Sequence, residues 1–286
     1  MKTVLITGAG GVAGKALTAH LQGKSKLFAL PHAQLDIADE KQVRRVIGEK
    51  NPEIVFNCAA YTKVDQAEDE PEAARRANVD GARILAHALT ERGGKLIHLS
   101  TDYVFDGEKK GPYLPDDPVA PLSIYAQTKA DGEKAVLGSG GAHLIVRVAW
   151  VFASGGRTFL CRLKQLIMQE EFLRVADDRE GPCTYAPDLA AGLWKLAQKD
   201  ARGIHHFTNQ GSCSWHSFAE QLLATARKLN LPVKTKRIDR ISSTDLPLKA
   251  LRPNYSVLDL AKTIELLGGP PRHWEETLVD FLSEKG

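Results

Sequence analysis

The sequence predicts an α/β fold built on a doubly wound parallel sheet. Three features predict it: short strands that are apolar throughout, longer amphipathic stretches between them, and a glycine-rich turn directly after the first strand. A strand that is apolar on both sides is buried on both faces, and its alternation with helices indicates a parallel sheet covered by helices.

The first half of the chain alternates five predicted strands with four helices. The strands are expected at 4–7, 27–30, 54–56, 95–99 and 144–146, and the helices at 12–22, 40–50, 71–92 and 123–137. Asp39 is placed to cap the second helix, Pro71 suits the first turn of the third, and Gly93-Gly94 suits its end. The second half is less regular, with helices expected at 157–169, 186–198 and 215–230 and short strands at 172–175 and 205–208.

Composition excludes several classes of protein. The 286 residues are 43% hydrophobic and 26% charged, as in ordinary globular proteins. The 38 basic residues nearly balance the 35 acidic ones, giving a net charge of +3, so nucleic acid and anionic membranes are not expected as partners. The N-terminal apolar run is too short for a signal peptide, so we expect a cytoplasmic protein. No two of the four cysteines form a CxxC pair, and we expect free buried thiols at Cys58, Cys161, Cys183 and Cys213.

The segment 7–14 lies between the first predicted strand and the first helix, and Gly8, Gly11 and Gly14 give it the spacing GxxGxxG. Without Cβ atoms the backbone approaches a pyrophosphate closely, and the helix N-terminus offers free N–H groups and a positive dipole. In this context the turn predicts a dinucleotide site. We therefore expect an NAD(P)-binding Rossmann domain over residues 1–150, followed over residues 151–286 by a mainly substrate-binding lobe that is partly interleaved with the sheet.

The end of the second predicted strand bears on the choice of dinucleotide. NAD-specific folds place an acid there for the ribose 2′-hydroxyl, whereas this chain has Leu30-Pro31-His32. The missing carboxylate and the nearby imidazole favour NADP(H), with NAD(H) as the alternative. Asp36 either accepts a hydrogen bond from the adenine amino group or caps the next helix.

Tyr125 and Lys129 form a YxxxK pair one turn apart on a predicted helix. An ammonium group nearby favours a phenolate, so we expect Lys129 to lower the pKa of Tyr125. Ser100 and Thr101 follow the fourth strand, at the edge where open α/β sheets bind ligands, and are placed to hydrogen-bond a substrate carbonyl. The small Ala59-Ala60 pair after the third strand leaves room for a cofactor.

The glycine turn, the Ser-Thr-Asp segment and YxxxK together resemble the extended short-chain dehydrogenase/reductases, and among them the dTDP-4-dehydrorhamnose reductase family. The similar segments span nearly the whole chain, at 59–65, 78–83, 99–107, 125–129, 147–150 and 252–256. The resemblance implies an NAD(P)H-dependent oxidoreductase that reduces the C4 ketone of dTDP-4-dehydro-L-rhamnose to dTDP-L-rhamnose, in nucleotide-sugar and surface polysaccharide biosynthesis.

The resemblance also implies roles for individual residues. Tyr125 is the expected proton donor, Lys129 its electrostatic partner, and Thr101 a third catalytic residue that tunes the tyrosine. Asp102 and Trp150 are expected to line the sugar site together with Thr101. The expected dinucleotide contacts are Gly8, Gly11, Val12, Ala13, Asp36, Ile37, Ala59, Ala60, Tyr61 and Thr62, with Tyr125 and Lys129.

Several alternatives stay open. Val148-Ala149 stand where the family usually has Thr-Ser, so a reductase or epimerase of another nucleotide sugar is one alternative. A non-catalytic regulatory subunit of the methionine adenosyltransferase type is a second, against which the intact Tyr125 and Lys129 argue. Some relatives bind magnesium through acidic residues at a dimer interface. The sequence shows no such cluster, so no metal is predicted, and a homodimer is an open alternative.

Overall fold

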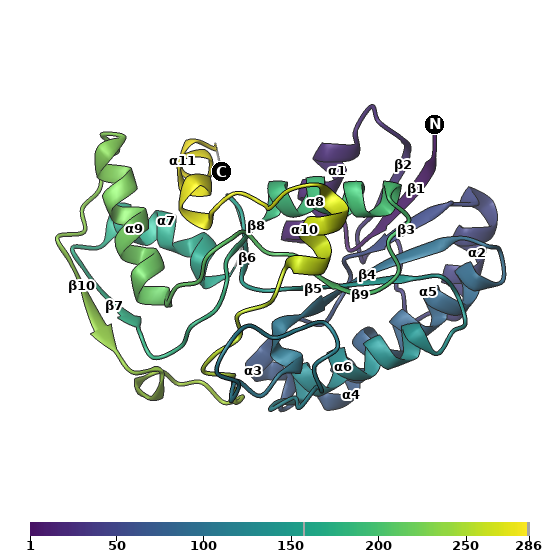
Figure 1. Ribbon diagram of the computed structural model, residues 1–286, viewed down its shortest axis with the longest axis horizontal. Helices are drawn as coiled ribbons and strands as arrows, with labels where there is room; N and C mark the ends of the chain where they lie inside the picture. The colour runs from purple at the N-terminus through teal and green to yellow at the C-terminus, as the bar shows by residue number, and fades with distance from the viewer. Residues whose placement is uncertain (157, 285–286) are drawn as a thin grey trace.

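The computed structural model describes residues 1–156 and 158–284. Within them, the central element is a six-stranded sheet, parallel throughout, in the order β2-β1-β3-β4-β5-β9 (Figure 1). Its strands are β1 (Thr3–Thr7), β2 (Lys26–Leu30), β3 (Ile54–Asn57), β4 (Lys95–Thr101), β5 (Leu144–Val148) and β9 (Gly203–His206). The predicted fold class, a doubly wound parallel sheet of the Rossmann type, is confirmed.

Helices cover both faces of this sheet. One layer holds α1 (Val12–Leu21), α8 (Ala186–Gln198) and α10 (Ala261–Leu267), and the other holds α2 (Glu40–Lys50), α5 (Gly81–Thr90) and α6 (Ile124–Leu137) (Figure 1). In β1, Val4 and Ile6 belong to the core under α1 and α8, while Leu5 between them belongs to the core under α2 and α5. This two-sided burial is why the strands are apolar throughout.

The strand order creates a crevice at one edge of the sheet. Because β2 and β3 lie on opposite sides of β1, the chain leaves the carboxyl ends of β1 and β3 in different directions, and ligands of doubly wound sheets bind at such a point. The glycine turn follows β1 and the segment 58–62 follows β3. Both predicted cofactor segments therefore lie at this switch point.

A second, smaller core lies at the other end of the molecule. There α7 (Phe159–Gln169), α9 (Trp215–Lys228) and α11 (Thr277–Ser283) pack near the parallel pair β7 (Phe172–Ala176) and β10 (Arg237–Ile241) (Figure 1). Aromatic rings fill it: Phe152 lies 5.2 Å from both Phe218 and Phe281, edge to face. Another parallel pair, β6 (Val151–Phe152) and β8 (Thr184–Tyr185), leads into it. The second half also supplies β9, α8 and α10 to the larger sheet.

The predicted helix over 71–92 is wrong at its middle. The segment divides into α4 (Pro71–Arg75), a π-helical turn η1 (Arg76–Asp80), and α5. At this turn the Asn78 carbonyl lies against α6, where a Cβ on Gly132 would come within 2.2 Å of the Asn78 oxygen. The wider turn thus turns Asn78 toward α6, where its amide donates to Thr128 Oγ1 at 3.0 Å.

The remaining boundaries lie close to prediction. The helix expected over 157–169 begins at Phe159, with Thr158 as its cap, and Arg157 lies outside the described residues. Several elements were not predicted. Among the described residues they are α3 (Val64–Ala67), the strands β6, β8 and β10, the helices α10 and α11, and the 3₁₀ turns η2 (Asp102–Val104), η3 (Ser243–Asp245) and η4 (Trp274–Glu276).

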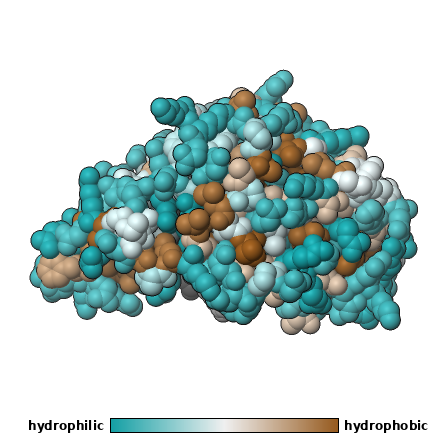
Figure 2. Space-filling model, turned by 90° about the horizontal axis from the view of Figure 1, so that it is seen from below, coloured by the Kyte–Doolittle hydropathy of each residue, from teal (hydrophilic) through white to brown (hydrophobic). Residues whose placement is uncertain are grey.

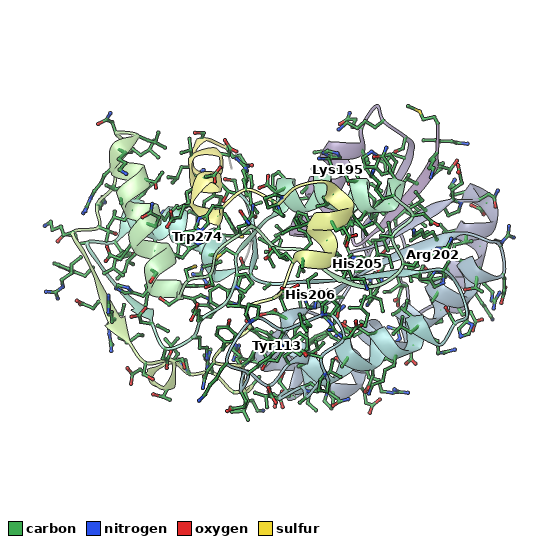
Figure 3. All side chains as sticks on the ribbon, in the orientation of Figure 1. Tyr113, Lys195, Arg202, His205, His206 and Trp274 are labelled. Atoms are coloured by element: carbon green, nitrogen blue, oxygen red, sulfur yellow. The ribbon has the colours of Figure 1, made fainter. Side chains whose placement is uncertain are left out.

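The face drawn in Figure 2 is mostly hydrophilic, with hydrophobic residues in separate small groups. Within the described ranges, no helix combines the length and apolar character that a membrane span requires. Side chains of both halves meet around β9, where His205 and His206 are buried and Tyr113 lies nearby (Figure 3).

Candidate active site

The glycine turn is shaped by contacts that leave no room for side chains. Gly8 has a left-handed backbone (φ +63°), and a Cβ there would lie 2.5 Å from the Ala59 nitrogen. A Cβ on Gly14 would lie 2.4 Å from the Gly8 carbonyl oxygen. The N-cap of α1 is Gly11, which offers no side chain to the first-turn N–H groups. These groups are left for a ligand, and a phosphate fits them.

Asp36 does not cap α2. Asp39 does, since its carboxylate accepts from the Gln42 nitrogen at 3.1 Å, so the capping alternative for Asp36 is wrong. Asp36 instead accepts from the Ala38 nitrogen at 3.0 Å and forms an ion pair with Arg76 at 2.5 Å. Its contact with adenine stays a prediction. The neighbouring Ile37 is buried against Gly81.

The segment after β3 is tied to the sheet and to η1 by its backbone. The Ala59 nitrogen donates to Asn57 Oδ1 at 3.2 Å, and the Tyr61 nitrogen donates to Asn78 Oδ1 at 2.9 Å. The Tyr61 hydroxyl donates to Glu70 at 2.7 Å. Ala59 thereby packs against Gly8, joining two of the predicted cofactor segments.

Tyr125 and Lys129 enter the site from α6. Ser123 caps this helix by accepting from the Ala126 nitrogen at 3.3 Å, which puts Tyr125 in the first turn. Both side chains are buried, with Tyr125 9% and Lys129 2% exposed. Lys129 Nζ donates to the Leu99 carbonyl at 2.6 Å, and its charge acts on the Cys58 thiol. Tyr125, Lys129 and the segment after β3 therefore lie together in one region.

The predicted lowering of the Tyr125 pKa is wrong for this structure. Burial raises that pKa, and the charge of Asp102 raises it further, whereas the Thr101 hydroxyl lowers it. Lys129 does not offset this rise, because its ammonium group is directed toward the Leu99 carbonyl in β4 instead of the phenol oxygen. Burial lowers the pKa of Lys129 to about 8, opposed by Glu133 and Cys58.

Thr101, the last residue of β4, lies beside Tyr125, and Asp102 follows it. The Thr101 hydroxyl donates to Asp102 Oδ1 at 3.0 Å and accepts from the Tyr103 nitrogen at 3.2 Å. Burial raises the pKa of Asp102 to about 7, although the hydroxyls of Ser256 and Thr101 act to lower it. This carboxyl therefore gains or loses a proton near neutral pH.

Polar atoms in this region are buried without partners. In residues 1–156 and 158–284, Ser100 Oγ and Trp150 Nε1 have no hydrogen-bond partner. Trp150 also has a left-handed backbone (φ +42°), which costs a non-glycine residue roughly 1–3 kcal/mol. Buried polar groups without partners are rare in folded proteins, and strain of this kind is typical of ligand sites.

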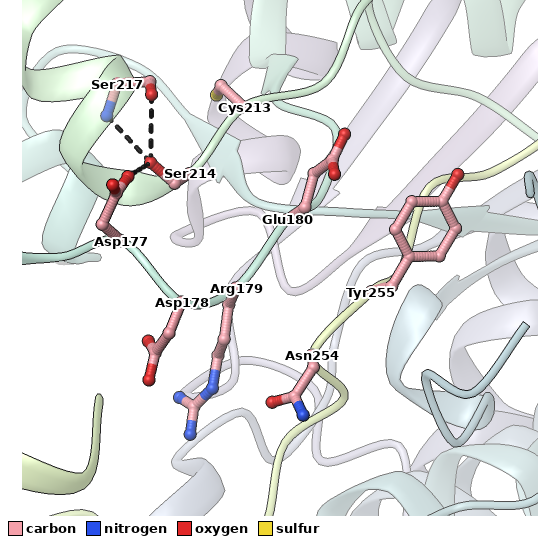
Figure 4. Close-up of a pocket in the computed structure, with 9 residues that line it drawn as sticks. All are labelled: Asp177, Asp178, Arg179, Glu180, Cys213, Ser214, Ser217, Asn254 and Tyr255. Atoms are coloured by element: carbon pink, nitrogen blue, oxygen red, sulfur yellow. Dashed lines mark hydrogen bonds between the residues drawn. The ribbon is translucent and has the colours of Figure 1, made fainter. Parts of the chain in front are cut away.

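A cavity of about 530 Å³ opens beside this region, between the smaller lobe and the segment 254–255 (Figure 4). Trp150 packs against Gly181, the residue that follows Glu180 of the cavity wall, where an added Cβ would meet the indole ring at 2.9 Å. Burial and the nearby charge of Arg252 lower the pKa of Arg179 in the cavity wall. The lining residues are Asp177, Asp178, Arg179, Glu180, Cys213, Ser214, Ser217, Asn254 and Tyr255.

Sequence reasoning missed a row of polar side chains beneath Lys129. Thr7, Asn57 and His98 lie in β1, β3 and β4, buried among apolar neighbours, and connect in that order to the lysine. A polar residue inside each of three otherwise apolar strands was the available signal. It was not used because each one, taken singly, looks like a strand end or a lone exception.

The whole chain, residues 1–286, matches the family described as RmlD substrate binding domain. The chain belongs to this family. The dTDP-4-dehydrorhamnose reductase of Aggregatibacter actinomycetemcomitans is 37% identical to it and is matched over 98% of both proteins. The spore coat polysaccharide biosynthesis protein SpsK of Bacillus subtilis is also 37% identical, with 100% of this chain and 98% of that protein covered.

Solved structures of the RmlD family agree with the fold. A dTDP-4-dehydrorhamnose reductase from Bacillus anthracis, crystallised in complex with NADP, superposes with a TM-score of 0.93 at 35% identity over the full length of both chains. The resemblance drawn from the sequence motifs is thus confirmed. Within residues 1–156 and 158–284, no group of three or more His, Cys, Asp and Glu side chains is arranged to hold a metal ion.

Proposed function

We propose that this chain is an NADPH-dependent reductase that converts dTDP-4-dehydro-L-rhamnose to dTDP-L-rhamnose. The observation that supports this most directly is that a buried phenol, Tyr125, lies beside Thr101 at the carboxyl end of β4, on the sheet edge that also carries the glycine turn after β1. Full-length similarity to named dTDP-4-dehydrorhamnose reductases adds to it.

The residues present fit a dinucleotide. Gly8 and Gly14 have no room for a Cβ because the backbone of Ala59 and of the turn itself lies against them, so the turn needs glycine to keep its shape. The first turn of α1, capped by Gly11 without a side chain, offers free N–H groups to a pyrophosphate. At the end of β2, His32 is exposed where an NAD-specific fold has an acid, so a 2′-phosphate meets no carboxylate from that residue. NADPH, when bound, supplies the hydride for the reduction.

Tyr125 acts as the proton donor. As hydride reaches the C4 carbon, the carbonyl oxygen becomes an alkoxide, and the phenol transfers its proton to that oxygen to give the alcohol. The raised pKa keeps the phenol protonated before the reaction. The Thr101 hydroxyl stabilises the phenolate left behind by turning its one O–H from Asp102 to Tyr125. Lys129 adds positive charge within the same buried site.

The sugar and its diphosphate are assigned to the face between the two lobes. Ser100 and Trp150 each have one buried polar atom without a partner, and the hydroxyls and ketone of the sugar would satisfy them. Arg179 has its Nε and Nη1 atoms unpartnered within the described ranges, and Arg252 lies near. We assign Arg179 to the diphosphate, since guanidinium groups match phosphate oxygens in pairs.

The test is NADPH oxidation with a panel of nucleotide 4-ketosugars, comparing the unsubstituted chain with Tyr125→Phe. We expect this variant to keep its fold and its NADPH affinity and to lose at least about 100-fold in kcat, the usual range for losing a general acid. Tyr185→Phe is the matched control, because it removes a phenol hydroxyl bonded to Glu284 in the smaller lobe. Its kcat should be unchanged.

Other results identify the alternatives. Turnover without net NADPH consumption, with nicotinamide retained through purification, indicates an epimerase. A different preferred sugar in the panel assigns another nucleotide-sugar reductase. No oxidation with any member, together with binding to a methionine adenosyltransferase, indicates a regulatory subunit. Any of these results overturns the proposal.

A further inference from the structure

A row of buried polar side chains crosses three strands and ends at Lys129. Thr7 Oγ1 donates to Asn57 Oδ1 at 2.6 Å, Asn57 Nδ2 lies 3.0 Å from His98 Nδ1, and His98 Nε2 lies 3.5 Å from Lys129 Nζ. None of these four side chains is more than 2% exposed. Because these side chains are excluded from water, their protonation is set by the hydrogen bonds they make with one another.

The direction of each bond in this row is fixed from one end. The Ala59 backbone nitrogen donates to Asn57 Oδ1, and a backbone N–H has no other role, so the oxygen of the Asn57 amide is identified. Its nitrogen therefore faces His98 and donates to Nδ1. Burial and the charge of Lys129 hold the pKa of His98 well below its usual range, so the ring is neutral and carries its single proton on Nε2.

This tautomer presents an N–H to the lysine. An ammonium at Lys129 has only donors and gains no bond from Nε2–H, whereas a neutral amine accepts from it. We propose that His98 is a positioning residue for the reaction, which presents its Nε2–H to Lys129 and so favours the amine form of that lysine. The proposal rests on the proposed function for its catalytic meaning, because it identifies what readies Lys129 to exchange a proton.

The other groups that face Lys129 act in the opposite sense or are neutral. The Leu99 carbonyl of β4 accepts from Nζ at 2.6 Å, and Glu133 of the same helix favours the ammonium. Glu133 is itself bonded to Arg147, at 2.7 and 2.9 Å, which reduces its effect. Burial raises the pKa of Cys58 to about 12, and burial raises that of Tyr125, so both are uncharged at neutral pH. Among these neighbours, His98 is the group whose N–H direction favours the amine.

A lysine balanced in this way has a use in turnover. Each reduction removes one proton from Tyr125, and that proton must be replaced before the next cycle. A buried ammonium that is stabilised too strongly gives its proton up slowly, whereas one balanced by His98 releases it and recovers it near neutral pH. The row from Thr7 to His98 then has a function beyond filling the sheet.

The first test needs neither cofactor nor substrate. ¹⁵N–¹H correlation spectra of the histidine rings, with His98 assigned by its loss in His98→Gln, separate a protonated ring nitrogen from an unprotonated one. We expect Nε2 protonated and Nδ1 unprotonated throughout pH 6–9. A proton on Nδ1, or a charged ring, overturns the proposal without bearing on the proposed function.

The second test reverses the tautomer. Asn57→Asp leaves only acceptors opposite His98, which moves the ring proton to Nδ1 and turns the Nε2 lone pair toward Lys129. We expect the pKa of Lys129, followed by NMR of its side chain, to rise by about one unit or more, a tenfold change in its protonation. The limb of the pH profile of kcat/KM that reports the Lys129 pKa should shift by the same amount, while the KM for NADPH should stay within about twofold of that of the unsubstituted chain.

Asn57→Asp also adds charge, so the control is the same substitution in the His98→Phe background, which has no tautomer to reverse. The rise in the Lys129 pKa should be clearly smaller there. Equal rises in the two backgrounds show that charge alone acts and overturn the proposal. If these variants fail to fold, the ring spectra of the unsubstituted chain still decide it.

Discussion

Gly14→Ala has two opposing effects on stability, each of known size. Alanine is favoured over glycine in a helix interior by about 1 kcal/mol, so propensity alone predicts a more stable protein. The structure places the new Cβ 2.4 Å from the Gly8 carbonyl oxygen and 2.7 Å from Ala9 Cα. These are backbone atoms, which do not swing aside, and ordinary contact requires them to move by the order of 1 Å.

Overpacking of this kind costs about 1–3 kcal/mol, often more where backbone must shift, so the clash outweighs the gain in propensity. We expect Gly14→Ala to lose about 1–2 kcal/mol in the free energy of unfolding. The displaced atom is the Gly8 oxygen, which accepts from the Gly11 nitrogen at 3.0 Å and holds the turn. NADPH affinity should therefore fall at least about tenfold, which corresponds to 1.4 kcal/mol.

Urea denaturation measures the stability and fluorescence titration measures the affinity for NADPH. Gly10→Ala is the control for stability, because its nearest neighbour, Pro31 Cβ, lies at an ordinary 3.8 Å from the new atom. It should stay within about 0.5 kcal/mol of the unsubstituted chain. A Gly14→Ala protein that is as stable as the control and binds NADPH equally well refutes the reasoning.

Three further predictions follow from buried or exposed charge. Glu133→Gln leaves Arg147 without its bidentate partner, in a site where both side chains are at most 4% exposed. We expect it to lower the free energy of unfolding, measured by urea denaturation, by about 3–5 kcal/mol. The double variant Glu133→Leu with Arg147→Met should recover most of this loss, because it leaves no unpaired buried charge. Burial holds the pKa of His206 at about 3, so the stability it contributes is complete above pH 6.5 and falls as pH drops toward 3. His206→Gln should reduce the slope of stability against pH between 6 and 4 by about 1.4 kcal/mol per unit, and an unchanged slope would contradict this. His32→Glu should lower the kcat/KM ratio of NADPH over NADH at least about tenfold, because it sets a carboxylate where a 2′-phosphate is expected; an unchanged ratio places that phosphate elsewhere.

The fold was predictable because local patterns in this chain agree with its topology. Apolar runs such as Ile54-Val55-Phe56 have no polar face, and the helices between them have one, so the sheet and its two layers follow from periodicity. The π-helical turn at 76–80 was not predictable from local sequence, and within it the Asn78 carbonyl packs against Gly132 of α6, far along the chain. Tertiary contacts of that kind leave no local pattern.

The sequence was enough to predict which segments meet in the site, but not how their side chains are oriented there. Parallel strands bring their carboxyl ends to one edge, so the segments after β1, β3 and β4 had to converge. Trp150, whose backbone is left-handed, packs against Gly181 and Trp215, which lie far along the chain. The direction of the Lys129 side chain likewise depends on a carbonyl in β4.

The pKa of Tyr125 is raised where lowering was expected, and a phenol protonated at rest suits reduction better than a phenolate does. A reductase needs a proton on this oxygen when the ketone arrives, and burial keeps it there by disfavouring the charged form. The cost of burial falls on the phenolate after transfer, and the Thr101 hydroxyl is the group placed to offset it. In the direction of oxidation the same burial hinders the base. Burial therefore keeps Tyr125 protonated at rest, and transfer of its proton depends on groups that stabilise the phenolate, so Thr101→Val should reduce the rate of reduction more than it reduces binding of the sugar.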